Sequence, residues 1–217
     1  MKKLLNKELK LAIIPLTWFF LAASLMTLIP GYPILLGSFF VCLGLFQTFI
    51  TFRESNDILY TALLPVKKRD AVKAKYLMVL FFECLSFLLM CILTALRMTV
   101  LAGAKPYVTN FLMNPNPIYL GFVLLVFLTF NLIFVGGFFR TAYKVGGPFI
   151  AFIIVAMLIV AVSESLHHIP GLVFLHTPSG EKLGLQWIVF GIALTVFALG
   201  TFLSERKSKK RFESIDL

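Results

Sequence analysis

Charged residues are scarce in this 217-residue chain, and negative charge is the scarcest. Asp, Glu, Lys and Arg together make up only 14% of the residues, and 20 basic residues stand against 10 acidic ones. Hydrophobic residues make up 59%, more than the roughly 45–50% that is usual in soluble domains. This composition excludes an ordinary soluble domain and favours a membrane protein.

Motifs for binding nucleotides and metals are also missing. The phosphate-binding pattern Gly-x-x-x-x-Gly-Lys-Ser/Thr does not occur, so the chain does not hold ATP in that manner. Cys42, Cys84 and Cys91 lie in apolar stretches without the spacing of metal ligands, and we interpret them as small buried hydrophobic residues. We therefore expect no cofactor on this chain and no enzymatic activity of its own.

One group of polar residues resembles a metal site at first sight. It consists of Glu164, His167, His168 and His176, and the Glu-x-x-His spacing places two candidate ligands on one helical face. A metal site needs three or four ligands, however, and no second cluster of His or acidic residues completes this one. We favour polar residues at a membrane edge over a metal site or a catalytic site.

Long apolar stretches take up most of the chain. About 20 residues of α-helix cover a hydrocarbon core of about 30 Å. Lipid offers no hydrogen-bond partners to the backbone, and the stretches do not alternate as barrel strands do, so they must be helices. The sequence predicts an all-α polytopic membrane protein, a single domain over residues 1–217, with six transmembrane helices at Leu11–Ile29, Ile34–Phe52, Tyr76–Leu101, Ile118–Phe139, Pro148–Ile169 and Leu185–Leu203.

Positive charge is unevenly distributed between the ends of these stretches. Seventeen of the 20 Lys and Arg fall in four segments, residues 1–10, 53–75, 140–147 and 204–217. The positive-inside rule places these segments and both termini in the cytoplasm. The net charge of +10 then reflects topology and contact with anionic membrane lipid, not nucleic acid. Arg97, near the outer end of the third span, is expected to snorkel to the headgroups.

Segment 53–75 contains a short helical pattern. An amphipathic helix is predicted by the apolar residues that recur at helical spacing, Ile58, Leu59, Ala62 and Leu63. Pro65 ends this helix, and Asp70 is expected to cap the third spanning helix. The residues alone leave two interpretations open. The segment is either an interfacial helix with a topology signal, or a lever that a cytoplasmic partner grips.

The order of residues in this segment points to a family. The run reads Glu54-x-Asn56-x-x-x-Tyr60-x-x-Leu63-Leu64-Pro65-Val66-Lys67-Lys68-Arg69-Asp70-x-Val72-x-x-Lys75-Tyr76-Leu77. It resembles the loop between the second and third helices of small ABC-2 type permeases. These are membrane subunits of bacterial ATP-binding-cassette exporters, including exporters of phenol-soluble modulins and other antimicrobial or toxic peptides. Six helices and cytoplasmic termini extend the resemblance over the whole chain.

The resemblance implies an ABC-2, type V exporter-like fold in the bacterial cell membrane. It implies a separate ABC-type ATPase subunit, which binds ATP and Mg, and a dimer with a second permease copy or a paralogue. Residues 1–10 would be a cytoplasmic amphipathic segment, and Leu4–Leu11 would form the connecting helix before the first span. Residues 163–184 would form an outer segment partly embedded in the membrane. The coupling loop that docks on the ATPase would comprise residues 53–75, with contacts from Asn56, Ile58, Leu59, Tyr60, Leu63, Leu64, Pro65, Lys67, Lys68, Arg69 and Asp70.

Three polar residues lie inside the predicted spans at similar depth. Gln47, Glu83 and Asn131 are each about 8–12 Å from the inner face, at about 1.5 Å of rise per residue. Polar groups within a membrane are costly, so they commonly mark a function. We expect either a polar layer that lines a translocation path or a subunit interface, or local hydrogen bonds between packed helices.

Two functions from different classes follow from the sequence. The first is the membrane subunit of an ABC exporter that moves an amphipathic or apolar substrate, such as a peptide toxin or an antimicrobial peptide. The alternative is a non-transporting scaffold or regulator whose basic loop binds lipid or a signalling partner. The residue order of the loop favours the exporter. The sequence leaves open the substrate, homodimer against heterodimer, and export against self-immunity.

Overall fold

The structure is a computed structural model that describes residues 2–63, 65–141, 144–166, 168–175 and 182–215. It is 81% helical, and within the described residues no strand occurs. Five helices of this part are long and apolar enough to cross a membrane, and a bent pair of shorter helices provides a sixth candidate span. The prediction of an all-α membrane protein is confirmed.

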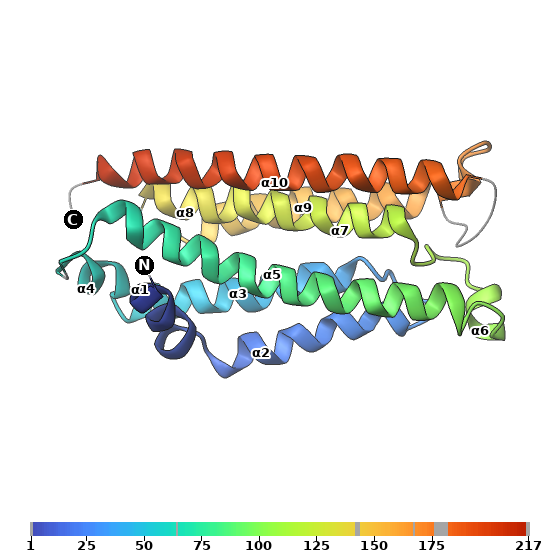
Figure 1. The fold of residues 1–217 in the computed structure, drawn as a ribbon, viewed down its shortest axis with the longest axis horizontal. Helices are drawn as coiled ribbons and strands as arrows, with labels where there is room; N and C mark the ends of the chain where they lie inside the picture. Colours follow the sequence, from blue (N-terminus) through green and yellow to red (C-terminus); the bar gives the residue numbers. More distant parts are fainter. Residues whose placement is uncertain (1, 64, 142–143, 167, 176–181, 216–217) are drawn as a thin grey trace.

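The five long spans form most of the bundle (Figure 1). Four of them are single helices. The fourth span is continuous over Pro117–Thr141, but its middle turn is π-helical and therefore wider than an α-helix. In chain order the spans are α3 (Leu36–Glu54), α5 (Lys68–Thr99), α7 (Pro117–Thr129) with the π-helical η3 (Phe130–Val135) and α8 (Gly136–Thr141), α9 (Gly146–Leu166) and α10 (Leu183–Glu213).

The first span differs from its prediction. Its helix begins at Pro15, not at Leu11, because Ile13 and Ile14 are extended; a residue before proline disfavours the helical conformation. The part of this candidate span after the break consists of α2 (Pro15–Leu21) and the 3₁₀ helix η2 (Ala22–Leu28). Before the break lie α1 (Lys2–Lys7) and the π-helical η1 (Glu8–Ala12), turned by 80° relative to the span. The basic N-terminal segment therefore bends away from the first span.

The third span begins earlier than its apolar run. Helix α5 starts at Lys68 and continues to Thr99, about 48 Å at 1.5 Å per residue. Its N-cap is Lys67, whose side chain makes no capping bond, and Asp70 lies in the first turn. The expected cap at Asp70 is therefore wrong, although a carboxylate there still suits the helix dipole. Basic residues before the apolar run prolong α5 because they are good helix formers.

Aromatic packing holds the spans together. The rings of Phe46 on α3 and Phe149 on α9 stack with centroids 3.6 Å apart. Phe49 meets Phe134 and Phe138 edge to face at 5.1 Å and 4.9 Å. Because these rings come from α3, η3, α8 and α9, they fix the relative positions of three spans.

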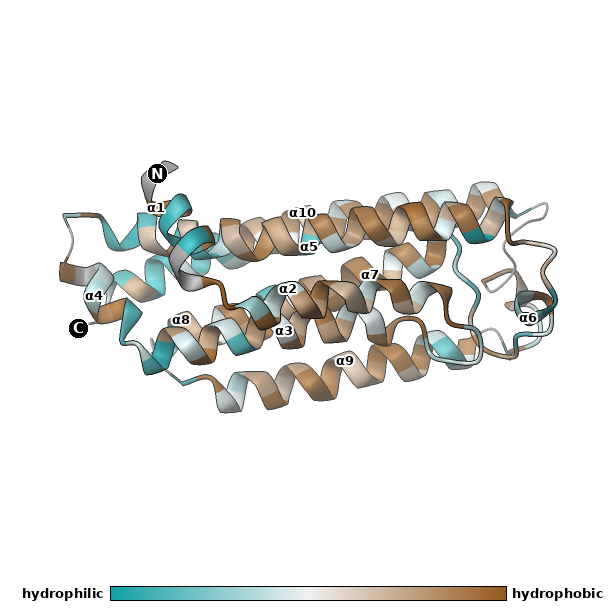
Figure 2. Cartoon of the chain, turned by 90° about the horizontal axis from the view of Figure 1, so that it is seen from below, coloured by the Kyte–Doolittle hydropathy of each residue, from teal (hydrophilic) through white to brown (hydrophobic). Residues whose placement is uncertain are grey.

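The two ends of the bundle differ in polarity. Helices α1 and α4 (Asp57–Leu63) and the C-terminal end of α10 lie at one end, and the short α6 (Lys105–Val108) lies at the other (Figure 1). Colouring by hydropathy shows an apolar middle with hydrophilic residues gathered at the ends, most densely at the end with α1 and α4 (Figure 2). This pattern agrees with a bundle that spans a bilayer. That the end with α1 faces the cytoplasm stays a prediction.

Arg97 lies inside the opposite end of the bundle. Its side chain is buried, with 4% of its surface exposed. One guanidinium nitrogen donates to the Thr27 carbonyl at 2.7 Å and another to Asn114 Oδ1 at 2.9 Å, and the group lies 4.3 Å from the centre of the Tyr107 ring. The expectation that Arg97 snorkels is wrong, because η2 and the loop between α5 and α7 each supply an acceptor inside the bundle.

The predicted outer segment 163–184 is described only in part. Residues Ser163 to Leu166 belong to α9, and Val173–Leu175 form the 3₁₀ helix η4. The Leu175 carbonyl accepts a bond from Asn116 Nδ2 at 2.6 Å, and the Phe174 carbonyl accepts one from Gln186 Nε2 at 2.7 Å. These bonds tie the segment to the starts of α7 and α10. Its embedding in the membrane stays a prediction.

Candidate functional site

The short helix α4 follows a sharp turn after α3. Asn56 adopts a left-handed conformation (φ 51°), which Asn tolerates better than most residues. Its carbonyl accepts a bond from the Tyr60 N–H at 3.0 Å, and Ser55 Oγ donates to the Thr51 carbonyl at 2.8 Å, closing the end of α3. Asn56, predicted as a contact to a partner, therefore has a backbone role that sets the direction of α4.

Helix α4 forms where the sequence predicts it and ends at Leu63, two residues before Pro65. Most of its apolar side chains point away from the bundle, the reverse of the usual packing of an amphipathic helix. Asp57 and Thr61 are buried, whereas Leu59, Tyr60 and Leu63 are 49%, 60% and 86% exposed. The inward face of α4 thus carries the polar Asp57 and Thr61 beside Ile58, and the outward face is apolar.

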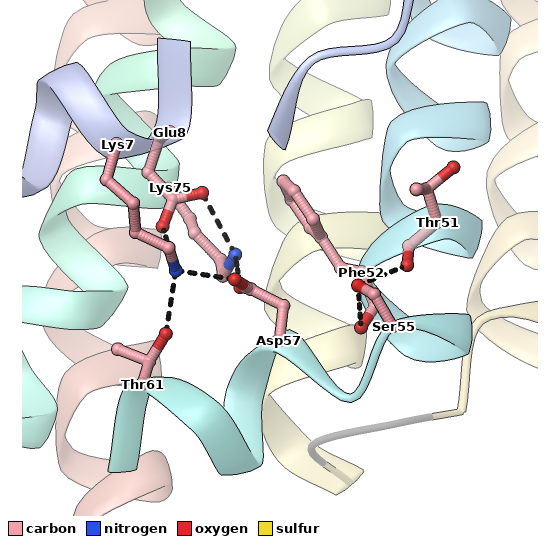
Figure 3. Close-up of polar contacts among 8 residues, drawn as sticks. All are labelled: Lys7, Glu8, Thr51, Phe52, Ser55, Asp57, Thr61 and Lys75. Carbon is pink, nitrogen blue, oxygen red and sulfur yellow. Dashed lines mark hydrogen bonds and ion pairs between the residues drawn. The ribbon is translucent and has the colours of Figure 1, made fainter. Parts of the chain in front are cut away.

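The inward face is polar because it meets two lysines. Lys75 Nζ on α5 lies 2.6 Å from Asp57 Oδ2 and 3.1 Å from Glu8 Oε2. Lys7 Nζ lies 2.5 Å from Asp57 Oδ1, 3.4 Å from Glu8 Oε1 and 2.8 Å from Thr61 Oγ1. Figure 3 shows these side chains converging from the N-terminal segment, α4 and α5. We call Lys7, Glu8, Asp57 and Lys75 the ionic quartet.

The ionic quartet is almost closed to solvent. The side chains of Lys75 and Glu8 are 2% and 1% exposed, and the Lys75 ammonium also lies 3.4 Å from the centre of the Phe52 ring. Two positive and two negative charges balance one another, as buried charges require. Removing one member would leave an uncompensated buried charge, which costs about 3–5 kcal/mol.

The pKa values of two quartet members show that pairing outweighs burial. For Asp57, burial favours the neutral acid, but the charge of Lys75 and the hydrogen bonds from Lys7 and Lys75 lower the pKa below its ordinary value. For Lys7, burial likewise favours the neutral amine, but the hydrogen bond to Asp57 and the charges of both carboxylates raise the pKa. Both groups therefore stay charged at neutral pH.

Two basic residues of the predicted coupling loop contact the C-terminal part of the described chain. Lys68 Nζ donates to the Ile215 carbonyl at 2.6 Å, and Arg69 forms an ion pair with Glu213. Lys67 is exposed. Leu64 lies outside the described residues. A small cavity of ≈ 50 Å³ separates α4 from the bundle, and its walls include Ile58, Val66 and Phe139.

Two of the three predicted intramembrane polar residues meet. Asn131 Nδ2 donates to Glu83 Oε2 at 2.9 Å, and Thr201 Oγ1 on α10 lies 3.4 Å from the same nitrogen. Glu83 Oε1 and Asn131 Oδ1 are buried and have no hydrogen-bond partner in the described part of the chain. Gln47 is half-buried on α3, and its side chain forms no hydrogen bond with the described residues. The layer is therefore a Glu83–Asn131 pair without Gln47.

A second polar group surrounds the π-helical turn that carries Asn131. The Asn131 carbonyl accepts a bond from Ser204 Oγ at 2.8 Å, and the Tyr76 hydroxyl lies 2.8 Å and 2.9 Å from Ser204 Oγ and Ser208 Oγ. A π-helical turn leaves a backbone carbonyl open to such partners, and such turns are frequent at functional sites. The serines recur at helical spacing with Thr201 on α10, a signal that the sequence analysis missed.

The metal hypothesis finds no support in the described part of the chain. No group of three or more His, Cys, Asp or Glu there has the geometry to hold an ion. Glu164 Oε2 instead accepts a bond from the Met113 N–H at 2.9 Å. His167 and His176 lie outside the described residues.

Comparison with known proteins decides the family. A family model described as "ABC-2 family transporter protein" matches residues 3–209. The chain belongs to this ABC-2 transporter family. No curated protein and no solved structure matches it. The ABC-2 permease that the loop predicts is confirmed, while the likeness to exporters of phenol-soluble modulins stays a prediction.

Membership in the ABC-2 family makes the chain a permease component of a membrane transporter that is not itself catalytic. The family implies association with an ABC ATPase subunit. Against this background the ionic quartet is the feature that sequence reasoning missed. Its signal is the placement of two scarce acids, Glu8 and Asp57, inside two of the four basic segments.

Proposed function

We propose that this ABC-2 protein is the permease subunit of an exporter that moves amphipathic or apolar cargo, including peptides, out of the cell. ATP hydrolysis in a separate subunit drives it, and α4 is the helix that docks on that subunit. The observation that carries the proposal is the orientation of α4. Its polar face is anchored in the protein, and its apolar face points outward.

The outward face of α4 is suited to a groove in a partner protein. Leu59, Tyr60 and Leu63 are exposed together at the hydrophilic end of the bundle (Figure 2). Burying one Leu-sized side chain is worth about 1.5–3 kcal/mol, so these residues gain most when a partner covers them. Lys67, exposed nearby, adds a polar contact that contributes about 0–1 kcal/mol.

The ionic quartet supports a role of α4 in transmitting motion. Asp57 joins α4 to Lys75 on α5 and to Lys7 in the N-terminal segment. Breaking a buried ion pair is costly, so a displacement of α4 moves α5 and the N-terminal segment with it. Because α5 is continuous from Lys68 to Thr99, the displacement reaches the opposite end of the bundle.

Buried polar atoms in the bundle are consistent with the proposed cargo, and exposed apolar surface is consistent with the proposed dimer. The Glu83–Asn131 pair places buried polar atoms with no partner among the described residues inside the apolar region. In the proposed function, a polar part of the cargo binds them. Helix α9 carries a stripe of exposed apolar residues at helical spacing, Ile150, Ile154, Leu158 and Val162. In the proposal, lipid and a second permease copy cover such faces.

Truncation of the outward face of α4 tests the proposal. The double variant Tyr60→Ala/Leu63→Ala removes two exposed side chains that make no contact with the ionic quartet. We expect it to insert normally and to weaken association with the ATPase subunit by about tenfold or more, since each 1.4 kcal/mol is a factor of ten. The measurement is co-purification with the candidate ATPase, followed by substrate-stimulated ATPase activity.

The matched control is Val100→Ala/Val108→Ala, two exposed apolar residues at the opposite end of the bundle. It should leave ATPase association unchanged. If Tyr60→Ala/Leu63→Ala keeps full association and full transport, α4 is not the docking helix. If the variant instead loses only membrane or lipid contacts, the scaffold function gains support and the exporter loses it.

A further inference from the structure

A basic groove lies between α5 and α10 at the end of the bundle that carries the termini. Both helices extend beyond a bilayer core of about 30 Å, because their 32 and 31 residues span about 48 and 46 Å. The groove between them measures ≈ 810 Å³ and is lined by Arg69, Asp70, Lys73, Leu203, Arg206, Lys207, Lys209 and Lys210. This volume lies within the range of about 300–1,000 Å³ that is usual for sites of small ligands.

The charge in the groove is only partly neutralised. Arg69 pairs with Glu213, and Lys209 pairs with Glu205 at 2.5 Å. Lys73, Lys207 and Lys210 are exposed and form no ion pair with the described residues. Asp70 is the one acidic residue among those that line the groove. The groove therefore presents a positive surface that attracts an anion.

The groove continues into an apolar surface. Leu203 lies in its wall, and Leu199, Phe202 and Leu203 are all exposed on the same helix. The Arg206 guanidinium lies 4.2 Å from the centre of the Phe202 ring, where the basic part of α10 meets the apolar part. A ligand that fits both parts carries an anionic head and apolar tails.

We propose that this groove is a binding site for an anionic glycerophospholipid of the inner leaflet. The phosphate binds among Lys73, Lys207 and Lys210, and the acyl chains lie along the apolar surface from Leu203 to Leu199. Basic pockets between spanning helices on the cytoplasmic side are suited to anionic headgroups. The site does not depend on the proposed transport function, and it ties α10 to α5 through a lipid that both helices contact.

A fluorescent reporter at the mouth of the groove tests the site. The variant Leu203→Trp is made in a background with Trp18→Phe and Trp187→Phe, and the full chain is reconstituted in phosphatidylcholine vesicles with increasing phosphatidylglycerol. Quenching by brominated phosphatidylglycerol, compared with brominated phosphatidylcholine, gives the relative binding constant. We expect a preference for phosphatidylglycerol of at least about tenfold and up to about a hundredfold. In Lys73→Gln/Lys207→Gln/Lys210→Gln this preference disappears, since each basic group near an anionic lipid contributes about fivefold.

Two matched variants separate the site from general charge and from misfolding. Arg53→Gln/Arg140→Gln/Lys144→Gln removes three exposed basic residues elsewhere and should keep the preference. Lys73→Arg/Lys207→Arg/Lys210→Arg retains the charge and should also keep it. An equal loss in the Arg53 triple variant would mean general surface charge and would overturn the proposal.

Two further outcomes would also overturn it. If millimolar inorganic phosphate displaces the brominated phosphatidylglycerol from the native groove, the groove is a site for a soluble anion. If the groove triple variant keeps its lipid preference but no longer retains the ATPase subunit, the groove is a protein interface.

Discussion

Lys75 and Asp57 form a buried ion pair that joins the long helix α5 to the short helix α4, with 2.6 Å between Nζ and Oδ2. The two residues are 18 positions apart in the chain, and the loop between them includes Pro65. A pair of this kind makes α4 and the start of α5 one mechanical unit, although α4 has only seven residues. Lys7 and Glu8 extend the same unit to the N-terminal segment.

Neutralising Asp57 is expected to destabilise the protein strongly. Asp57→Asn leaves two buried lysines against one carboxylate, and losing a partner from a buried pair costs about 3–5 kcal/mol. Thermal unfolding of the detergent-solubilised protein measures the effect. Asp70→Asn removes an acid that has no ion pair among the described residues, and it should change the unfolding temperature little.

A double variant shows whether the quartet acts as a unit. Asp57→Asn/Lys7→Gln restores the charge balance, so we expect it to be less destabilised than the sum of the two single variants. Additive effects would mean that Lys7 and Asp57 are not coupled, contrary to the structure.

Attachment of α4 should depend on pH only outside the neutral range. The pKa of Asp57 is lowered, so its contribution to stability is present above about pH 4, the pKa of an unfolded Asp, and is lost as the pH falls further. The pKa of Lys7 is raised, so its contribution is present below about pH 10 and is lost as the pH rises further. We expect α4 to stay attached between these limits.

A spin label at Leu63 reports this attachment, because Leu63 is 86% exposed and its own replacement leaves the quartet intact. Leu63→Cys is labelled in a background with Cys42, Cys84 and Cys91 changed to Ser. Label mobility should stay constant from pH 5 to 9, which lies inside the range of about 4–10 set by the two groups. A transition within that interval would contradict the assignment.

Glu83→Gln is expected to reduce transport without reducing stability. A glutamine retains an oxygen that accepts the bond from Asn131, so the packing between α5 and η3 is preserved. The ionisable group is lost, however, and in the proposed function the contact with the cargo depends on it. We expect transport to fall by about tenfold or more while expression and thermal stability hold. Unchanged transport would remove Glu83 from the mechanism.

Cysteine labelling tests the orientation in the membrane. Lys67 and Lys182 are both exposed and lie at the starts of α5 and α10, at opposite ends of the bundle (Figure 1). In a cysteine-free background, an impermeant reagent added from outside should modify Lys182→Cys and leave Lys67→Cys untouched. The reverse pattern would place the termini and α4 outside the cell.

The sequence by itself determined the spans and the existence of α4. A bilayer core of fixed thickness demands long apolar helices, so the apolar runs located the five long helices and the bent sixth candidate. The ends of α5 and α10 were less certain, because both helices continue past their apolar runs. Periodicity and Pro65 likewise located α4. These features depend on neighbouring residues, which is why one sequence was enough to find them.

Only the tertiary structure decided which face of α4 points inward and which charges are paired. An amphipathic pattern defines two faces of a helix but not what each face meets. Here Lys75 and Lys7 lie between α4 and the bundle and pair with Asp57, so the polar face turns inward and the apolar face is left for a partner. The same limit applies to Arg97, whose acceptor Thr27 is 70 positions away. A buried charge demands a partner, but contacts across such separations follow from the packing of whole helices.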